Sequence, residues 1–153
     1  MAIALKANDQ EFFNNRGIAF YELGQWEKAL ADFNSAISLK HNYGEAFNNR
    51  GNVFLELRRF KEALADYNKT ISIWPDCSDA INNRGTVYQK LERYEDALRD
   101  FDKSLSLEPI NHEILNNRGM IYRELFQHER ALLDSMKLFL SNPITLRHSI
   151  TGG

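Results

Sequence analysis

The residues best suited to chemistry in this sequence are asparagines and arginines that recur in one short string. Asn-Asn-Arg-Gly occurs at Asn14–Gly17, Asn48–Gly51, Asn82–Gly85 and Asn116–Gly119, always 34 residues apart. An asparagine amide offers a hydrogen-bond acceptor and donors, so it matches a peptide group without reading side chains. An arginine offers a planar fork that fits a carboxylate. The asparagines are therefore candidates for contact with a peptide backbone, and the arginines for pairing with a carboxylate.

Groups that could perform catalysis or hold a metal do not form a site in the sequence. The histidines have no metal-ligand spacing, and the single cysteine, Cys77, has no histidine in its column of the repeat. One thiol supports neither a disulfide framework nor a cysteine-based zinc site. The phosphate-binding loop and nucleophile-elbow motifs are also missing from the sequence. We predict a protein that is not an enzyme and uses no cofactor and no metal.

Charge and composition argue against further classes. The 19 Lys and Arg residues are balanced by 21 Asp and Glu, giving a net charge of −2, whereas nucleic-acid binders usually carry a basic surplus. No apolar run approaches the roughly 20 residues that span a bilayer. The apolar stretch at the start is too short for a signal peptide. We therefore expect no nucleic-acid partner and no membrane, with the cytoplasm as the default location.

The recurring string must be positioned by helices. Phe13, Gly17 and Phe20 recur at the steps of three and four that one helix face requires, and Ala29 and Phe33 continue the pattern in a second helix. Small residues in the glycine and alanine columns let two helices approach closely. A polar or glycine-containing break separates the helices, and the second helix is expected to begin at Trp26, Phe60, Tyr94 and His128 in successive units.

This pattern resembles the tetratricopeptide repeat (TPR) family. The second unit carries the family's residues in order: Phe47, Gly51, Phe54, Ala63, Tyr67 and Pro75. The resemblance covers residues 10–143 and implies an all-α fold, a right-handed superhelical solenoid of antiparallel helix pairs. Arginine stands where the family usually has leucine. Ser135 replaces the second-helix aromatic, so we expect the fourth unit to pack differently.

The repeat also predicts the organisation of the chain. Residues 10–43, 44–77, 78–111 and 112–143 are the four expected repeats. Residues 1–9 align with the end of a preceding second helix, because Ala2–Lys6 matches Ala36–Lys40 one repeat later. This opening favours a piece of a longer array or a protein that has lost its first helices. Residues 144–153 are expected to form a tail or a partial capping helix.

In the TPR family the first helices line a concave groove that binds ligands. The resemblance implies that an asparagine ladder contacts a peptide backbone, with three further residues making apolar contacts. Acidic residues outnumber basic ones in the groove-facing columns, which favours neutral or basic ligands. The predicted peptide-binding residues are Asn14, Asn15, Asn48, Asn49, Asn52, Asn82, Asn83, Asn116, Asn117, Tyr21, Leu55 and Met120.

Each polar column also has a structural interpretation. An asparagine could instead bond a neighbouring unit or a helix turn. Acids in the first turn of each first helix, such as Glu11, complement the helix dipole without a ligand. The arginines are matched one for one by aspartates, which favours structural ion pairs: Arg16, Arg50, Arg84 and Arg118 with Asp32, Asp66, Asp100 and Asp134.

The favoured function is a non-enzymatic scaffold that binds an extended peptide or a partner helix in its groove. One alternative is the TPR arm of a larger enzyme, such as a glycosyltransferase or kinase, that selects substrates. A second alternative is self-assembly through exposed end repeats. Chaperone-tail binding is not expected, because Asn48, Glu113 and Asn117 occupy the three basic places of the family's carboxylate clamp.

Overall fold

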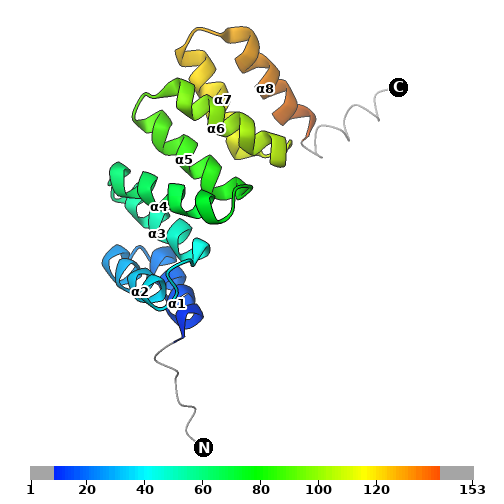
Figure 1. The fold of residues 1–153 in the computed structure, drawn as a ribbon. Coiled ribbons are helices and arrows are strands. Elements are labelled where there is room, and N and C mark those ends of the chain that lie inside the picture. The colour runs from blue at the N-terminus through cyan, green and yellow to red at the C-terminus, as the bar shows by residue number, and fades with distance from the viewer. Residues whose placement is uncertain (1–8, 142–153) are drawn as a thin grey trace, which may run out of the picture. The chain divides into compact units, whose positions relative to one another are not determined.

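The computed structural model describes residues 9–141 (Figure 1), and within this range the side chain of His128 is not described. The expected remnant of a preceding helix, apart from its last residue Asp9, lies outside the described residues. The expected tail at residues 144–153 also lies outside them.

The described residues form helices joined by short turns, and no strand occurs between residues 9 and 141. All four second helices begin at the residues predicted from the sequence, and the all-α prediction is confirmed. The helices are α1 (Gln10–Glu22), α2 (Trp26–Leu39), α3 (Gly44–Glu56), α4 (Phe60–Ile73), α5 (Ser78–Lys90), α6 (Tyr94–Leu107), α7 (His112–Glu124) and α8 (His128–Leu140).

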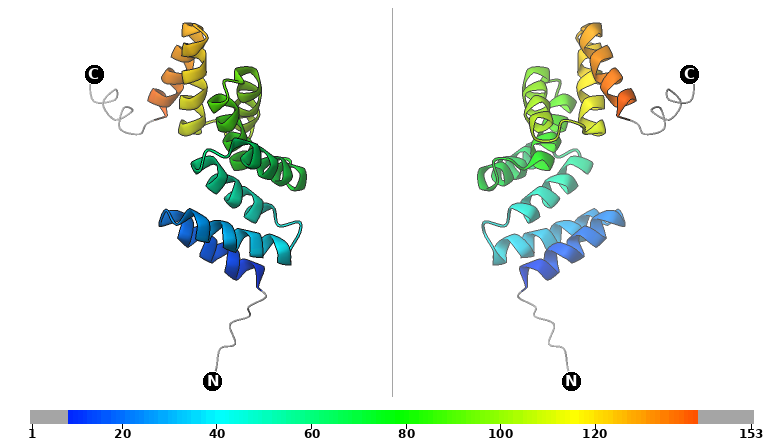
Figure 2. Two further views of the ribbon diagram at one scale, coloured as in Figure 1. Left: turned by 90° about the vertical axis from the view of Figure 1, so that its left-hand side faces the viewer. Right: turned by 90° about the vertical axis from the view of Figure 1, so that its right-hand side faces the viewer.

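The chain divides into two compact units, residues 1–80 and 81–153, with the boundary in the first turn of α5. In the first unit α1 packs on α2 and α3 on α4, while α2 also contacts α3. In the second unit α7 packs on α8 and α6 contacts α7. The pairs α1–α2, α3–α4 and α7–α8 each fold back on themselves as antiparallel hairpins (Figure 2).

The turn inside each hairpin uses the same backbone conformation. Gly24, Arg58, Glu92 and Phe126 all have positive φ, between 57° and 68°. In the first hairpin a backbone N–H closes the turn by donating from Gln25 to the carbonyl of Phe20 at 2.9 Å, and its counterparts do the same. Only the first turn has glycine, so the other three turns carry the cost, about 1 kcal/mol, of placing a side chain in this region.

In the first three strings the glycine lies beneath an aromatic ring of the second helix. A Cβ on Gly17 would lie 2.7 Å from Phe33, one on Gly51 2.7 Å from Tyr67, and one on Gly85 2.8 Å from Phe101. Such distances are too short for any side chain, which explains the glycine column. In the fourth hairpin the nearest atom to a Cβ on Gly119 is 3.9 Å away. The sequence prediction of a different fourth hairpin is confirmed.

Candidate functional site

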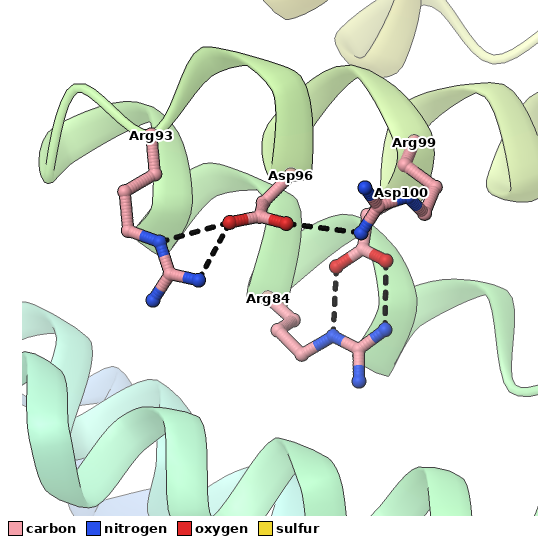
Figure 3. A network of polar contacts seen from close by, with 5 residues as sticks. All are labelled: Arg84, Arg93, Asp96, Arg99 and Asp100. Atoms are coloured by element: carbon pink, nitrogen blue, oxygen red, sulfur yellow. Dashed lines mark hydrogen bonds and ion pairs between the residues drawn. The ribbon is translucent and has the colours of Figure 1, made fainter.

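The arginines of the string form the predicted ion pairs. Each guanidinium donates two hydrogen bonds to the aspartate sixteen residues later, with N···O distances of 2.6 to 2.8 Å. The four aspartates are buried. Figure 3 shows this fork for Arg84 and Asp100, with the exposed pairs of Arg93 and Arg99 to Asp96 beside it. The arginine of each string therefore links the first helix of its hairpin to the second.

Arg50 and Arg118 also reach the hairpin before their own. The Nη1 of Arg50 donates to Asn34 Oδ1 at 2.7 Å. The Nη1 of Arg118 donates to Asp102 Oδ1. Asp134, with Asp102 adding to it, raises the pKa of Arg118 above its ordinary value. These arginines join neighbouring hairpins in addition to closing their own.

In the first and third strings the first asparagine joins successive first helices. Asn14 is fully buried, and its Nδ2 donates to Glu45 Oε1 at 2.9 Å. Asn82 makes the same bond to Glu113 at 3.2 Å. In these two bonds a glutamate from the first turn of the next first helix is the acceptor, and this role of the acidic column was not predicted from the sequence. The signal was available, because each asparagine stands 31 residues before a glutamate.

The asparagine amides differ in how much of them a ligand could reach. The Oδ1 of Asn14 accepts from Asn49 Nδ2 at 3.1 Å, so both ends of the Asn14 amide are engaged inside the structure. The Oδ1 atoms of Asn48 and Asn82 are buried and find no hydrogen-bond partner among the described residues. The more accessible members are Asn15 and Asn116, which are exposed, and Asn49, Asn83 and Asn117, which are half-buried.

A hollow of about 230 Å³ lies between α1 and α3 in the first unit. It brings three of the predicted site residues together, Tyr21, Asn49 and Asn52. Asn52 Oδ1 also accepts from the hydroxyl of Tyr67 at 2.8 Å. The remaining lining residues are Ile18, Glu22 and Phe33.

Tyr21 forms an amphipathic wall of this hollow. Its ring contacts the ring of Trp26 with the centroids 5.2 Å apart. Burial, together with the charge and the hydrogen bond of Glu56, raises the pKa of Tyr21 above its ordinary value. The phenol is therefore neutral at physiological pH and engaged with a carboxylate. Phe33, which is almost fully buried, supplies apolar surface that the sequence analysis did not assign to the site.

A second hollow, of about 580 Å³, lies in the second unit. It contains one predicted site residue, Met120, and uses equivalent repeat positions, since Gln89, Lys90 and Met120 correspond to Tyr21, Glu22 and Asn52. Its charges are mixed, unlike those of the first hollow. Leu55 lines neither hollow. The residues around the second hollow are Gln89, Lys90, Glu92, Tyr94, Met120, Arg123 and Glu124.

Within residues 9–141, no group of three His, Cys, Asp or Glu side chains is arranged to hold a metal ion. In the same part of the chain no helix is long and apolar enough to cross a bilayer.

Comparison with known families agrees with this architecture. A TPR repeat model matches residues 17–57, and a tetratricopeptide repeat model matches residues 44–77 and 78–111. The matched segments cover more than half of the chain. The chain belongs to the tetratricopeptide repeat family, whose members are generally protein-interaction scaffolds.

Three solved structures illustrate the similarity. The Arabidopsis OM64 TPR domain is 32% identical over 75% of this chain and 95% of its own, with a TM-score of 0.73. The first TPR domain of Spaghetti (RPAP3), bound to the HSP90 peptide SRMEEVD, is 22% identical over 82% and 99%, with a TM-score of 0.75. MamA from Desulfovibrio magneticus RS-1 is 23% identical over 96% and 80%, with a TM-score of 0.80.

The last two similarities concern the fold alone. A search of the curated proteins finds no match to the sequence.

Proposed function

We propose that this chain is a non-catalytic scaffold that binds an extended peptide along its first helices. The observation that carries the proposal is the hollow between α1 and α3, where Tyr21, Asn49 and Asn52 meet. Amide groups at its edge suit the peptide backbone. A hollow with apolar and polar walls suits one ligand side chain.

The lining of this hollow favours a basic side chain. Ile18 and Phe33 offer apolar surface for the methylene stem of a lysine or arginine, and Glu22 offers a carboxylate for its charged end. Glu56, hydrogen-bonded to Tyr21, adds negative charge nearby. This supports the neutral or basic ligand expected from the sequence.

An acidic tail is a poor fit for this chain. The related Spaghetti domain was solved with SRMEEVD, a peptide rich in acids. Here Glu45 and Glu113 lie on the first helices, bonded to Asn14 and Asn82. Like charges placed at a binding surface reduce affinity by repulsion. The proposed ligand therefore differs in charge from the peptide of that relative.

The test starts from random peptides selected on the immobilised chain. We expect selected peptides to contain a basic residue beside apolar ones. Fluorescence anisotropy should show about fivefold weaker binding to Glu22→Gln, because one exposed ion pair is lost. The matched control is Glu27→Gln, an exposed glutamate on α2 outside the hollow.

Two further variants test which part of the first-helix surface binds the peptide. Tyr21→Ala should abolish most of the binding, because it removes a wall of the hollow. Asn15→Ala, on an exposed asparagine outside the hollow, reports on the rest of the first-helix surface. Selection of acidic peptides, or equal binding to Tyr21→Ala and to the unmodified chain, would refute the proposal.

A further inference from the structure

The outer face of α8 carries large apolar side chains where the matching faces of earlier hairpins carry alanine or polar residues. Leu133, Met136 and Leu140 are 57%, 50% and 60% exposed. In the earlier hairpins the same repeat positions are also exposed, and the following hairpin contacts them through the hydrogen bonds of Arg50 to Asn34 and of Arg118 to Asp102. Those positions hold Ala31, Asn34 and Ser38, then Ala65, Asn68 and Ser72, then Arg99, Asp102 and Ser106.

This outer stripe differs from the surface on which the next hairpin stacks. Leu98 and Leu105 pack on a core that includes Ile114 and Ile121 of α7. Their counterparts one repeat later are Leu132 and Phe139, also exposed. Stacking of a further hairpin would bury these two residues. The stripe of Leu133, Met136 and Leu140 needs a different partner.

The spacing of the stripe suits a second helix. Leu133 and Leu140 stand seven residues apart on α8, and Met136 lies three residues after Leu133. A repeat of seven with apolar residues at two positions is the pattern of two helices packed along one seam. Phe126, in the turn just before α8, is also apolar and is 82% exposed.

We propose that the partner is a second copy of this chain, with the two α8 helices antiparallel and a two-fold axis close to Leu133. The charges on the stripe support this occupant. Glu129 and Lys137 are both exposed and stand four residues before and four after Leu133. Antiparallel pairing centred on Leu133 places Glu129 of each copy at the level of Lys137 of the other.

The remaining cation on this part of α8 is held within its own hairpin. Arg130 donates to Gln127 at 3.1 Å, and its guanidinium lies 5.7 Å from the ring centroid of Tyr122. The interface is isologous, because the same stripe serves both copies. Antiparallel pairing also brings opposite ends of the two helix dipoles together.

Sedimentation equilibrium from low to high micromolar concentration tests the pairing. We expect a reversible dimer for the unmodified chain and a monomer for Leu133→Glu combined with Leu140→Glu. The matched control is Ala65→Glu combined with Ser72→Glu, which adds the same charges at equivalent exposed positions of α4. This control should dimerise like the unmodified chain. Circular dichroism establishes that each variant is folded.

Two measurements test the geometry itself. In a Cys77→Ser background, Leu133→Cys should form a disulfide between copies under oxidation, while Arg99→Cys at the equivalent position of α6 should not. Glu129→Lys and Lys137→Glu should each weaken dimerisation about fivefold, since each reverses an exposed pair. The two changes together should restore it.

Three results would overturn the inference. The first is an unmodified chain that stays monomeric throughout, which would leave the stripe for a helix of another protein. The second is a dimer that survives the two glutamates but is lost with Leu132→Glu, which would mean end-to-end stacking. The third is failure of the paired charge reversal to restore dimerisation.

Discussion

The hairpins α3–α4 and α7–α8 carry the same Asn-Asn-Arg-Gly string, yet they use its glycine differently. Gly51 lies against the ring of Tyr67, which is fully buried. Gly119 faces no ring, because Ser135 stands in the aromatic column and its hydroxyl donates to the carbonyl of Ala131 at 2.9 Å. The glycine is therefore a steric requirement in one hairpin and not in the other.

The arginine of the string behaves alike in both hairpins. Arg50 and Arg118 each donate two hydrogen bonds to a buried aspartate and a third to the preceding hairpin. The comparison shows that two residues of one conserved-looking string can have separate roles. The ion pair closes every hairpin, whereas the close helix approach depends on the residue that the second helix supplies.

The largest expected effect is the loss of a buried aspartate. Asp66→Ala and Asp134→Ala should each lower the free energy of unfolding by about 3 kcal/mol, because each removes the buried carboxylate that accepts two of the arginine's hydrogen bonds. Urea denaturation followed by circular dichroism measures both. Similar costs in the two hairpins are the expected result. Asp102→Ala, on the exposed partner of Arg118, should cost less than about 1 kcal/mol. A cost at Asp134 as small as that at Asp102 would contradict a shared role for the ion pair.

The next effect should differ in sign between the hairpins. Gly51→Ala should destabilise by about 2 kcal/mol, because its Cβ would lie 2.7 Å from Tyr67 in a packed interior. Gly119→Ala has open space and should stabilise by up to about 1 kcal/mol, the helix propensity difference between alanine and glycine. Thermal and urea unfolding give both values. Destabilisation by both substitutions would mean that the ring does not explain the glycine column.

The repeat fold could be predicted almost completely from the sequence, because helix periodicity and the 34-residue step are local and redundant. The four ion pairs could also be predicted, since each arginine is matched by an aspartate at constant spacing. The bond from Asn14 to Glu45 realises the alternative in which an asparagine joins a neighbouring unit, but the glutamate acceptor was not predicted, because the acidic column was assigned to the helix dipole. Position in a column does not determine how an amide rotates. Phe33 lines the hollow from α2, whereas the predicted ladder lies on the first helices. Its place in the hollow could therefore not be predicted from the ladder columns.

The third prediction concerns a substitution that should make the α7–α8 hairpin resemble the α3–α4 hairpin. Ser135→Phe should place a ring over Gly119 and stabilise the fourth hairpin by about 1 kcal/mol through apolar burial. In that background Gly119→Ala should become destabilising. The double-mutant cycle should therefore give a coupling of about 2 kcal/mol between the two positions. Additive effects would show that the ring, once present, does not contact the glycine.

The smallest expected effect comes from the hydroxyl of Tyr67. Tyr67→Phe should cost about 1 kcal/mol or less at neutral pH, because it removes one hydrogen bond to Asn52 while Phe33 and Phe101 fill the same place in other hairpins. Burial raises the pKa of Tyr67 far above its ordinary value of 10.0. A raised folded-state pKa gives stability that is fully present below the pKa of the unfolded phenol and is lost as the pH rises.

The unmodified chain should therefore lose stability above pH 10 more steeply than Tyr67→Phe, and the order of the two should reverse at high pH. Urea denaturation at a series of alkaline pH values measures this crossing. Parallel pH curves for the unmodified chain and Tyr67→Phe would mean that the phenol reaches solvent in the folded hairpin, which its complete burial against Gly51 opposes.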